Sequence, residues 1–165
     1  MHAHLNSGPI DATTPRPLAE LLDCPAPVES LLNSSAQHLK FADGDTVFRQ
    51  ADDCEGLYLV ISGLFQRRAE RLESRLVLGD IRAGNLVELA AALGASRHTY
   101  TLVTITSGSM LFLPIDGLNR AFEAYPPLRM KLLQELAREV SRAYDVCTLT
   151  RLSSFRTRRV APFAE

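Results

Sequence analysis

The stretch LYLVISG, residues 57–63, decides the fold class of this 165-residue chain. Five apolar residues run from Leu57 to Ile61, and the turn residues Ser62 and Gly63 follow them. A short apolar run bounded by turn residues is typical of a strand that is buried on both faces. The stretch therefore predicts a buried strand at residues 57–61 that ends at Ser62-Gly63.

Further short strands are expected on both sides of this one. The residues FADGD at 41–45 predict a turn between two strands, because Asp and Gly favour turns. Residues 64–70 and 74–78 predict the two arms of a hairpin. We expect four arginines on the solvent-facing sides of this hairpin: Arg67, Arg68, Arg71 and Arg75.

Two more strands are predicted before Pro114, at residues 100–106 and 110–113. The residues Ser107-Gly108-Ser109 predict a turn between them. Many short strands at close spacing indicate a small β-barrel or roll. We expect a mainly β fold with flanking helices.

Helical patterns lie before and after the strands. Two short helices are predicted at residues 18–23 and 28–37, after a flexible arm at residues 1–17. Residues 115–125 predict another short helix. Pro126-Pro127 then opens a long helix through about residue 152, followed by a basic tail at residues 153–165. The helical lead-in and the roll together span residues 18–125.

The long helix carries an apolar seam whose members step by three and four residues: Leu133, Leu136, Val140, Ala143 and Cys147. Such spacing is typical of a coiled-coil contact, so we expect a homodimer through this helix. A helix that packs only on its own roll is the alternative interpretation.

Composition narrows the class of protein. The net charge of -1 does not indicate a nucleic-acid partner. The three cysteines are far apart, which indicates free thiols in the cytoplasm and no metal site. The chain shows no catalytic constellation, no signal peptide and no membrane-spanning run, so we expect neither an enzyme nor a membrane protein.

The sequence resembles the cyclic nucleotide-binding domain, on LYLVISG at residues 57–63, GNLVELA at residues 84–90 with Ser96-Arg97 after it, and the helix that opens at Pro126. It is most similar to the sensory half of catabolite-activator-type (Crp/Fnr) bacterial regulators. The resemblance implies a β-roll of the double-stranded β-helix or jelly-roll type, with a long C-terminal dimerisation helix. It also implies a cyclic nucleotide, cyclic AMP or cyclic GMP, as ligand, with no cofactor required.

The resemblance implies the following ligand-binding residues. Glu88 takes the ribose-binding position and Arg97 the phosphate-binding position, because a guanidinium binds a phosphate and a carboxylate accepts from a hydroxyl. Residues 89–93, which include Leu89 and Ala90, form the cassette helix. The remaining candidates are Val87, His98, Ala143 and Tyr144.

Two of these candidates depart from the family pattern. Val87 stands where the family usually has Gly, and His98 where it has Ser or Ala. The bland interpretations are that Val87 and Tyr144 belong to the core, that His98 is a packed or surface residue, and that Glu88 and Arg97 form an ion pair across an empty pocket.

The expected function is a regulatory sensory domain that binds a cyclic nucleotide or a related small anion and signals through its C-terminal helix. One alternative is a ligand-free dimerisation or adaptor module. Another is the sensory part of a Crp/Fnr-type transcription regulator. No helix-turn-helix fits in the residues that follow Ser154, so we expect no sequence-specific DNA binding by this chain alone.

Overall fold

The computed structural model describes Leu18, residues 22–71 and residues 74–157, of which residues 71, 74 and 146–157 are described through their backbone alone. The predicted arm at residues 1–17 and the last part of the predicted tail lie outside the described residues. The elements follow in the order α2 (Ala26–Ser35), β1 (Gln37–Phe41), β2 (Thr46–Phe48), β3 (Gly56–Arg71), β4 (Ser74–Ile81), β5 (Leu86–Val87), the helical turn η1 (Ala91–Ala95), β6 (Thr101–Pro114), α3 (Ile115–Ala124) and α4 (Pro126–Thr157).

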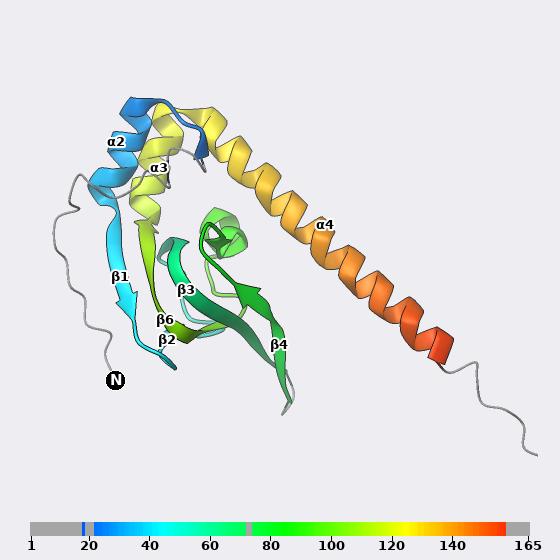
Figure 1. The fold of residues 1–165 in the computed structure, drawn as a ribbon. Coiled ribbons are helices and arrows are strands. Elements are labelled where there is room, and N and C mark those ends of the chain that lie inside the picture. The colour runs from blue at the N-terminus through cyan, green and yellow to red at the C-terminus, as the bar shows by residue number, and fades with distance from the viewer. Residues whose placement is uncertain (1–17, 19–21, 72–73, 158–165) are drawn as a thin grey trace, which may run out of the picture.

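The strands form one antiparallel sheet that curls into a roll (Figure 1). Its order is β1-β6-β3-β4, while β2 pairs with β6 and β5 pairs with β3. The turn at residues 41–45 and the β3–β4 hairpin are both present. A mainly β fold with flanking helices is thereby confirmed.

The two longest strands correct the predicted strand ends. Ser62-Gly63 does not end a strand, because β3 continues through it to Arg71. Ser107-Gly108-Ser109 is not a turn, because β6 is a single strand from Thr101 to Pro114. The register between β3 and β6 shifts repeatedly between Val60 and Phe65, which marks a bulged and strongly bent pair of strands.

Two glycines explain why these turn residues lie inside strands. A Cβ atom added at Gly63 would lie 2.6 Å from the Cα of Gly108, and one added at Gly108 would overlap the carbonyl oxygen of Ser62. Gly63 also has a φ of 91°, which favours glycine. The glycines therefore mark a close crossing of two backbones, and sequence patterns read such residues as a turn.

The helices α2 and α3 pack on each other at one end of the roll, where they cover a first hydrophobic cluster (Figure 1). A Cβ at the buried Gly117 of α3 would lie 2.9 Å from the Cβ of Ser35 in α2. The predicted helix at residues 28–37 is shifted, since Gln37 already belongs to β1. Of the predicted helix at residues 18–23, residues 19–21 lie outside the described part.

A second cluster fills the roll itself. Half of its members are aromatic. The cluster consists of Phe41, Phe48, Tyr58, Val60, Phe65, Ile81, Val87, Tyr100, Leu102 and Met110. The start of α4 packs on the first cluster through Leu128 and Leu132, which are 0% and 2% exposed. Beyond this contact α4 projects past the roll (Figure 1) and extends to Thr157, further than the predicted end near residue 152.

Candidate ligand site

The cassette loop runs from β5 into a short helical turn. Val87 is 1% exposed and Leu89 2% exposed, whereas Ala90 is half-buried. Between them Glu88 has a φ of 67°, in the left-handed region that a residue with a Cβ rarely adopts. The helical turn follows at once, since the N–H of Ala92 donates to the carbonyl of Glu88. The strained backbone conformation of Glu88 is therefore what directs its side chain into the roll.

The carboxylate of Glu88 is completely buried. Its Oε1 accepts hydrogen bonds from the N–H and hydroxyl of Thr99, at 3.3 and 3.2 Å. Its Oε2 is buried without any hydrogen-bond partner. Burial raises the pKa of Glu88 to about 7, because removal from water disfavours the charged form more than the two Thr99 bonds favour it.

His98 is packed beside this carboxylate. Its ring stacks on Phe48 with the centroids 3.8 Å apart, and its Nδ1 lies 3.7 Å from the Oε2 of Glu88. Neither of these two atoms has a hydrogen-bond partner. Burial lowers the pKa of His98, because removal from water disfavours the charged imidazolium. Of the bland interpretations, a packed histidine and a core position for Val87 are the ones that the structure shows.

Arg97 makes no ion pair with Glu88 in the described structure. Its side chain is 68% exposed, its Nε lies 3.7 Å from Asp53 and its Nη1 donates to the carbonyl of Ala51. A backbone bridge also joins Asp53 and Arg97. The ion pair that the sequence offered between Glu88 and Arg97 is therefore absent.

A different arginine points toward the site. Arg67 of β3 was expected on a solvent-facing side of the hairpin, but its side chain is only 27% exposed. Its guanidinium lies 5.8 Å from the ring centroid of Tyr100, and its Nε is buried without a partner. The period of two along a strand was the available signal, because Arg67 shares a face with Phe65, which is 0% exposed.

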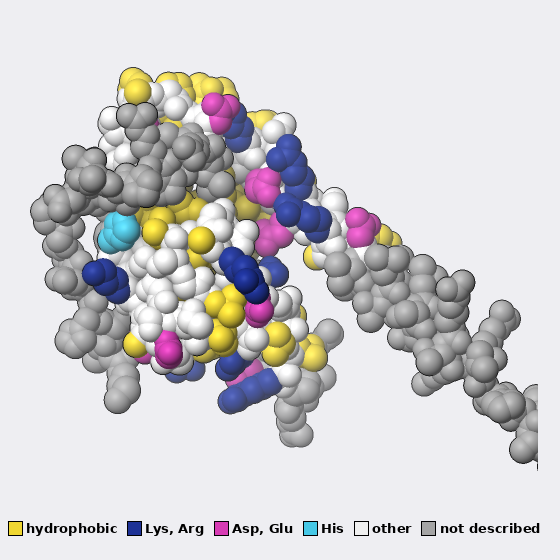
Figure 2. All heavy atoms as spheres, viewed as in Figure 1, with side chains coloured by type: hydrophobic (Ala, Val, Ile, Leu, Met, Phe, Trp, Pro, Cys, Tyr) yellow, Lys and Arg dark blue, Asp and Glu magenta, His cyan; other side chains and the backbone are white. Residues whose placement is uncertain are grey.

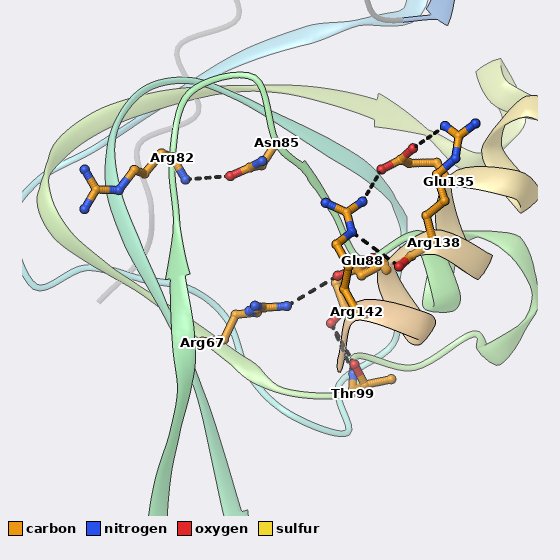
Figure 3. A network of polar contacts seen from close by, with 9 residues as sticks. Arg67, Arg82, Asn85, Glu88, Thr99, Glu135, Arg138 and Arg142 are labelled. Atoms are coloured by element: carbon orange, nitrogen blue, oxygen red, sulfur yellow. Dashed lines mark hydrogen bonds and ion pairs between the residues drawn. The ribbon is translucent and has the colours of Figure 1, made fainter. Parts of the chain in front are cut away.

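The helix α4 supplies the opposite wall through charged side chains. Glu139 lies 3.3 Å from the Nη1 of Arg67. Next to it, Glu135 pairs with Arg138 and Arg142 of the same helix at 3.1 and 2.8 Å. Figure 3 shows this polar network between the roll and the helix, and Figure 2 shows charged side chains of both signs gathered where α4 faces the roll.

The other predicted residues of α4 are mostly exposed. Ala143 is exposed and Tyr144 is 72% exposed, so a core position for Tyr144 is wrong. Along the predicted seam, Leu133 and Val140 are 39% and 60% exposed, whereas Leu136 packs partly on the chain's own core. The side chain of Cys147 lies outside the described residues.

Other kinds of site are not apparent in the described ranges. These residues contain no group of three or more His, Cys, Asp or Glu side chains arranged to hold a metal ion. None of the described helices combines the length and apolar character needed to cross a membrane. An open depression lies on α4 itself and is lined by Ala137, Arg138, Ser141, Arg142 and Asp145. This depression differs from the enclosed site at Glu88, because all of its lining residues are exposed.

The family model described as "Cyclic nucleotide-binding domain" matches residues 38–125, which is more than half of the chain. The chain belongs to this family. The matched range includes the cassette with Glu88, Arg97 and His98, so the resemblance predicted from the sequence is confirmed. A search of curated protein sequences found no match.

Solved structures support the same fold for this cyclic nucleotide-binding domain. A cyclic nucleotide-binding domain from Methylobacillus flagellatus has a TM-score of 0.72 at 16% identity, over 81% of this chain and 82% of that one. The sensor domain of the transcriptional regulator DNR from Pseudomonas aeruginosa has a TM-score of 0.65 at 20% identity, over 78% and 86% of the chains.

The catabolite activator protein from Thermus thermophilus is also similar, with a TM-score of 0.64 at 22% identity. The alignment covers 86% of this chain but only 61% of that protein. At such identities the likeness shows the fold, a cyclic nucleotide-binding β-roll with a long C-terminal helix, which confirms the predicted fold class.

Proposed function

We propose that this chain is a regulatory sensory domain that binds a cyclic nucleotide or a related small anion between the roll and α4. Binding and signalling, not catalysis, is its role. The observation that carries the proposal is the buried Oε2 of Glu88, which has no hydrogen-bond donor. An unpaired buried oxygen costs stability, and a ribose hydroxyl is a donor of the right kind.

The backbone at Glu88 supports the same role. A left-handed conformation in a residue with a Cβ costs on the order of 1 kcal/mol and concentrates at functional sites. Family membership supports a cyclic nucleotide as the ligand class, because the match spans the cassette. The free thiols of Cys24 and Cys54 agree with action in the reducing cytoplasm.

Calorimetry with cyclic AMP and cyclic GMP on the purified chain tests the proposal. We expect binding that weakens about 10-fold or more in Glu88→Gln, because a charged acceptor is lost. Glu123→Gln is the matched control, since Glu123 lies exposed on α3. Absence of heat at millimolar concentrations of both ligands contradicts the proposal.

A second copy of the chain is the proposed partner for α4. Leu133 and Val140 expose apolar side chains on this helix at the spacing of a coiled-coil contact. A change in α4 on ligand binding would then reach the partner subunit. Light scattering should give a dimer for the natural chain and a monomer for Val140→Asp. A monomeric natural chain contradicts this part of the proposal.

A ligand-free dimerisation or adaptor module is the second candidate. The observation that favours it is His98, whose stacked ring lies against Glu88 and takes space inside the roll. This candidate predicts a dimer without any nucleotide binding, so calorimetry and light scattering together separate the two functions. This chain has a fold similar to that of the sensor domain of the transcriptional regulator DNR. This similarity supports the alternative that the chain is the sensory part of a transcription regulator.

A further inference from the structure

Glu88 and His98 bring two buried polar atoms close together. The Oε2 of Glu88 and the Nδ1 of His98 lie 3.7 Å apart, and their side chains are 0% and 3% exposed. Neither atom has a hydrogen-bond partner in the described part of the chain. A buried polar atom without a partner is costly and rare, so each one calls for an explanation. A single proton between the two atoms satisfies both of them.

The contacts of the carboxyl group decide which oxygen carries such a proton. Oε1 accepts from the backbone N–H and the hydroxyl of Thr99 (Figure 3). A backbone N–H only donates, so Oε1 acts as an acceptor. The proton therefore belongs on Oε2, beside the Nδ1 of His98. A neutral imidazole accepts at one nitrogen, and an approach of about 1 Å brings the two atoms to ordinary hydrogen-bond distance.

The His98 ring is held in this place by its own contacts. It stacks on Phe48 with the two ring planes 7° apart. Its backbone N–H donates to the carbonyl of Asp52, and its carbonyl accepts from the N–H of Ala51, both at 2.9 Å. The Nδ1 is therefore kept beside the carboxyl group of Glu88.

The charges around Glu88 do not supply a cation for an ionised carboxylate. No arginine or lysine of the described residues forms an ion pair with it. Burial has the largest effect on the pKa of Glu88 and raises it to about 7. Arg67 lowers this pKa and Glu139 raises it, and these two groups pair with each other at 3.3 Å. Such surroundings favour a proton on the carboxyl group.

The charged groups around His98 are acidic. Burial has the largest effect on the pKa of His98 and lowers it, whereas Asp52 and Glu55 raise it. Burial thus favours the neutral imidazole, which is the form that accepts a hydrogen bond from Glu88. The other titratable neighbours of the pair have pKa values that burial raises, which favours their uncharged forms. They are Cys54, Tyr58 and Tyr100.

We propose that Glu88 carries a proton in the ligand-free chain, with His98 as its acceptor, and that ligand binding releases this proton. The inference rests on the proposed function and adds the regulation of the same site. The O–H bond of Glu88 breaks, its electron pair stays on Oε2, and the proton passes to the solvent. A ligand hydroxyl then donates to Oε2. His98 is a positioning residue in this step, because it acts through Glu88.

The ligand and the proton compete for the same oxygen. Linkage then requires that the ligand binds more tightly as the pH rises and the proton becomes easier to remove. With a titration near pH 7, we expect cyclic AMP to bind about 10-fold more tightly at pH 8 than at pH 6. The chain therefore responds to its ligand more strongly in a less acidic solution.

Calorimetry of the natural chain with cyclic AMP tests this competition. Titrations at pH 6 in two buffers with different ionisation heats should show about one proton released per ligand bound. Glu88→Gln controls for every other titrating group. This variant should bind weakly, with the same affinity at pH 6 and pH 8, and should release no proton.

Two histidine variants separate the acceptor from the ring. His98→Phe keeps a flat ring against Phe48 but offers no acceptor, so the proton on Glu88 is held less tightly. We expect the pH midpoint of cyclic AMP affinity to move down by about 0.5 to 1 pH unit in this variant. His38→Phe should keep the natural pH profile, because His38 lies on β1 and pairs with Leu111.

Nitrogen NMR of the ligand-free natural chain at pH 6 reads the His98 tautomer without any variant. We expect the ring proton on Nε2 and a free electron pair on Nδ1. A proton on Nδ1, or equal cyclic AMP affinity at pH 6 and pH 8, overturns the inference and leaves the proposed function standing. If the natural chain binds neither cyclic AMP nor cyclic GMP at either pH, the proposed function fails and the inference fails with it.

Discussion

Two arginines near the cassette, Arg67 and Arg97, differ in the backbone that holds them. Arg67 lies within a long strand that has neighbours on both sides, and its side chain is 27% exposed. Arg97 lies in a loop that is joined to Asp53 by a single bridge, and its side chain is 68% exposed. The comparison shows that spacing from Glu88 in the sequence identifies Arg97 as a candidate, whereas strand register directs Arg67 toward the site.

The largest expected effect comes from the close backbone crossing of β3 and β6 at Gly63 and Gly108, which precedes Arg67 along β3. In Gly108→Ala, the new Cβ overlaps the carbonyl oxygen of Ser62, so backbone must move. We expect a loss of about 2–4 kcal/mol in the free energy of unfolding, measured by urea denaturation. Gly94→Ala is the control, because a Cβ there has open space. Equal stability of the two variants would show that the close crossing at Gly108 does not contribute to the stability of the fold.

The next effect concerns the carboxylate that lies between the two arginines in sequence. The folded pKa of Glu88, about 7, lies above its ordinary value of 4.5, so the folded state binds the proton more tightly. Stability is then greatest at low pH and is lost as the pH rises from 4.5 through 7. We expect this group to make the chain about 2 kcal/mol less stable at pH 8 than at pH 5.

Urea unfolding of the natural chain and of Glu88→Gln at both pH values measures that contribution. His98 works in the opposite direction, because its lowered pKa removes stability as the pH falls. The difference between the two chains isolates Glu88. An identical pH dependence in both would show that the buried carboxyl group does not titrate in this range.

A smaller effect tests the space around Arg67. Gly79 and Gly84 have φ values of 124° and 86°, so alanine strains the backbone at either position. Only at Gly79 does the new Cβ also approach the Nη2 of Arg67, at 3.4 Å. We expect Gly79→Ala to lose about 1 kcal/mol of stability but to change nucleotide binding less than about 2-fold in calorimetry, because 3.4 Å is an ordinary van der Waals distance. A marked loss of binding in Gly79→Ala would show instead that Arg67 depends on this space.

The smallest effect is expected on the side of Arg97. Asp53→Asn removes the partner of Arg97, but both side chains are exposed, at 83% and 68%. Urea denaturation should show a change in stability within about 0.5 kcal/mol, and binding should change less than about 2-fold. A large gain in nucleotide affinity would show instead that Arg97, once released, enters the site. Such a result would reverse the comparison of the two arginines.

The strands and their turns were largely predictable because local patterns encode them. The apolar run at residues 57–61 forms part of β3, and the Asp-Gly turn at residues 41–45 joins two strands. The mistakes fell at Gly63 and Gly108, where the same residue type serves a close backbone contact instead of a turn. Sequence periodicity does not distinguish these two uses of glycine, because the contact joins segments far apart in the chain.

The candidate site was predictable only in part. Glu88 was identified through the cassette motif, and the structure buries it. Arg67 was missed because its partner Glu139 lies far along the chain, on another element. Tyr144 was a ligand-binding candidate with a core position as the alternative, and the core position is wrong because its side chain is 72% exposed.

The sequence by itself determined the family, the run of strands and helices, and the presence of an acidic cassette residue, because these follow from local composition and motif spacing. Only the tertiary structure decided which charges meet. Strand register turned Arg67 inward, the loop that holds Arg97 left its side chain exposed, and the path of α4 brought Glu139 to Arg67. The physical reason is that side-chain direction and charge pairing depend on contacts between distant segments, which folding creates.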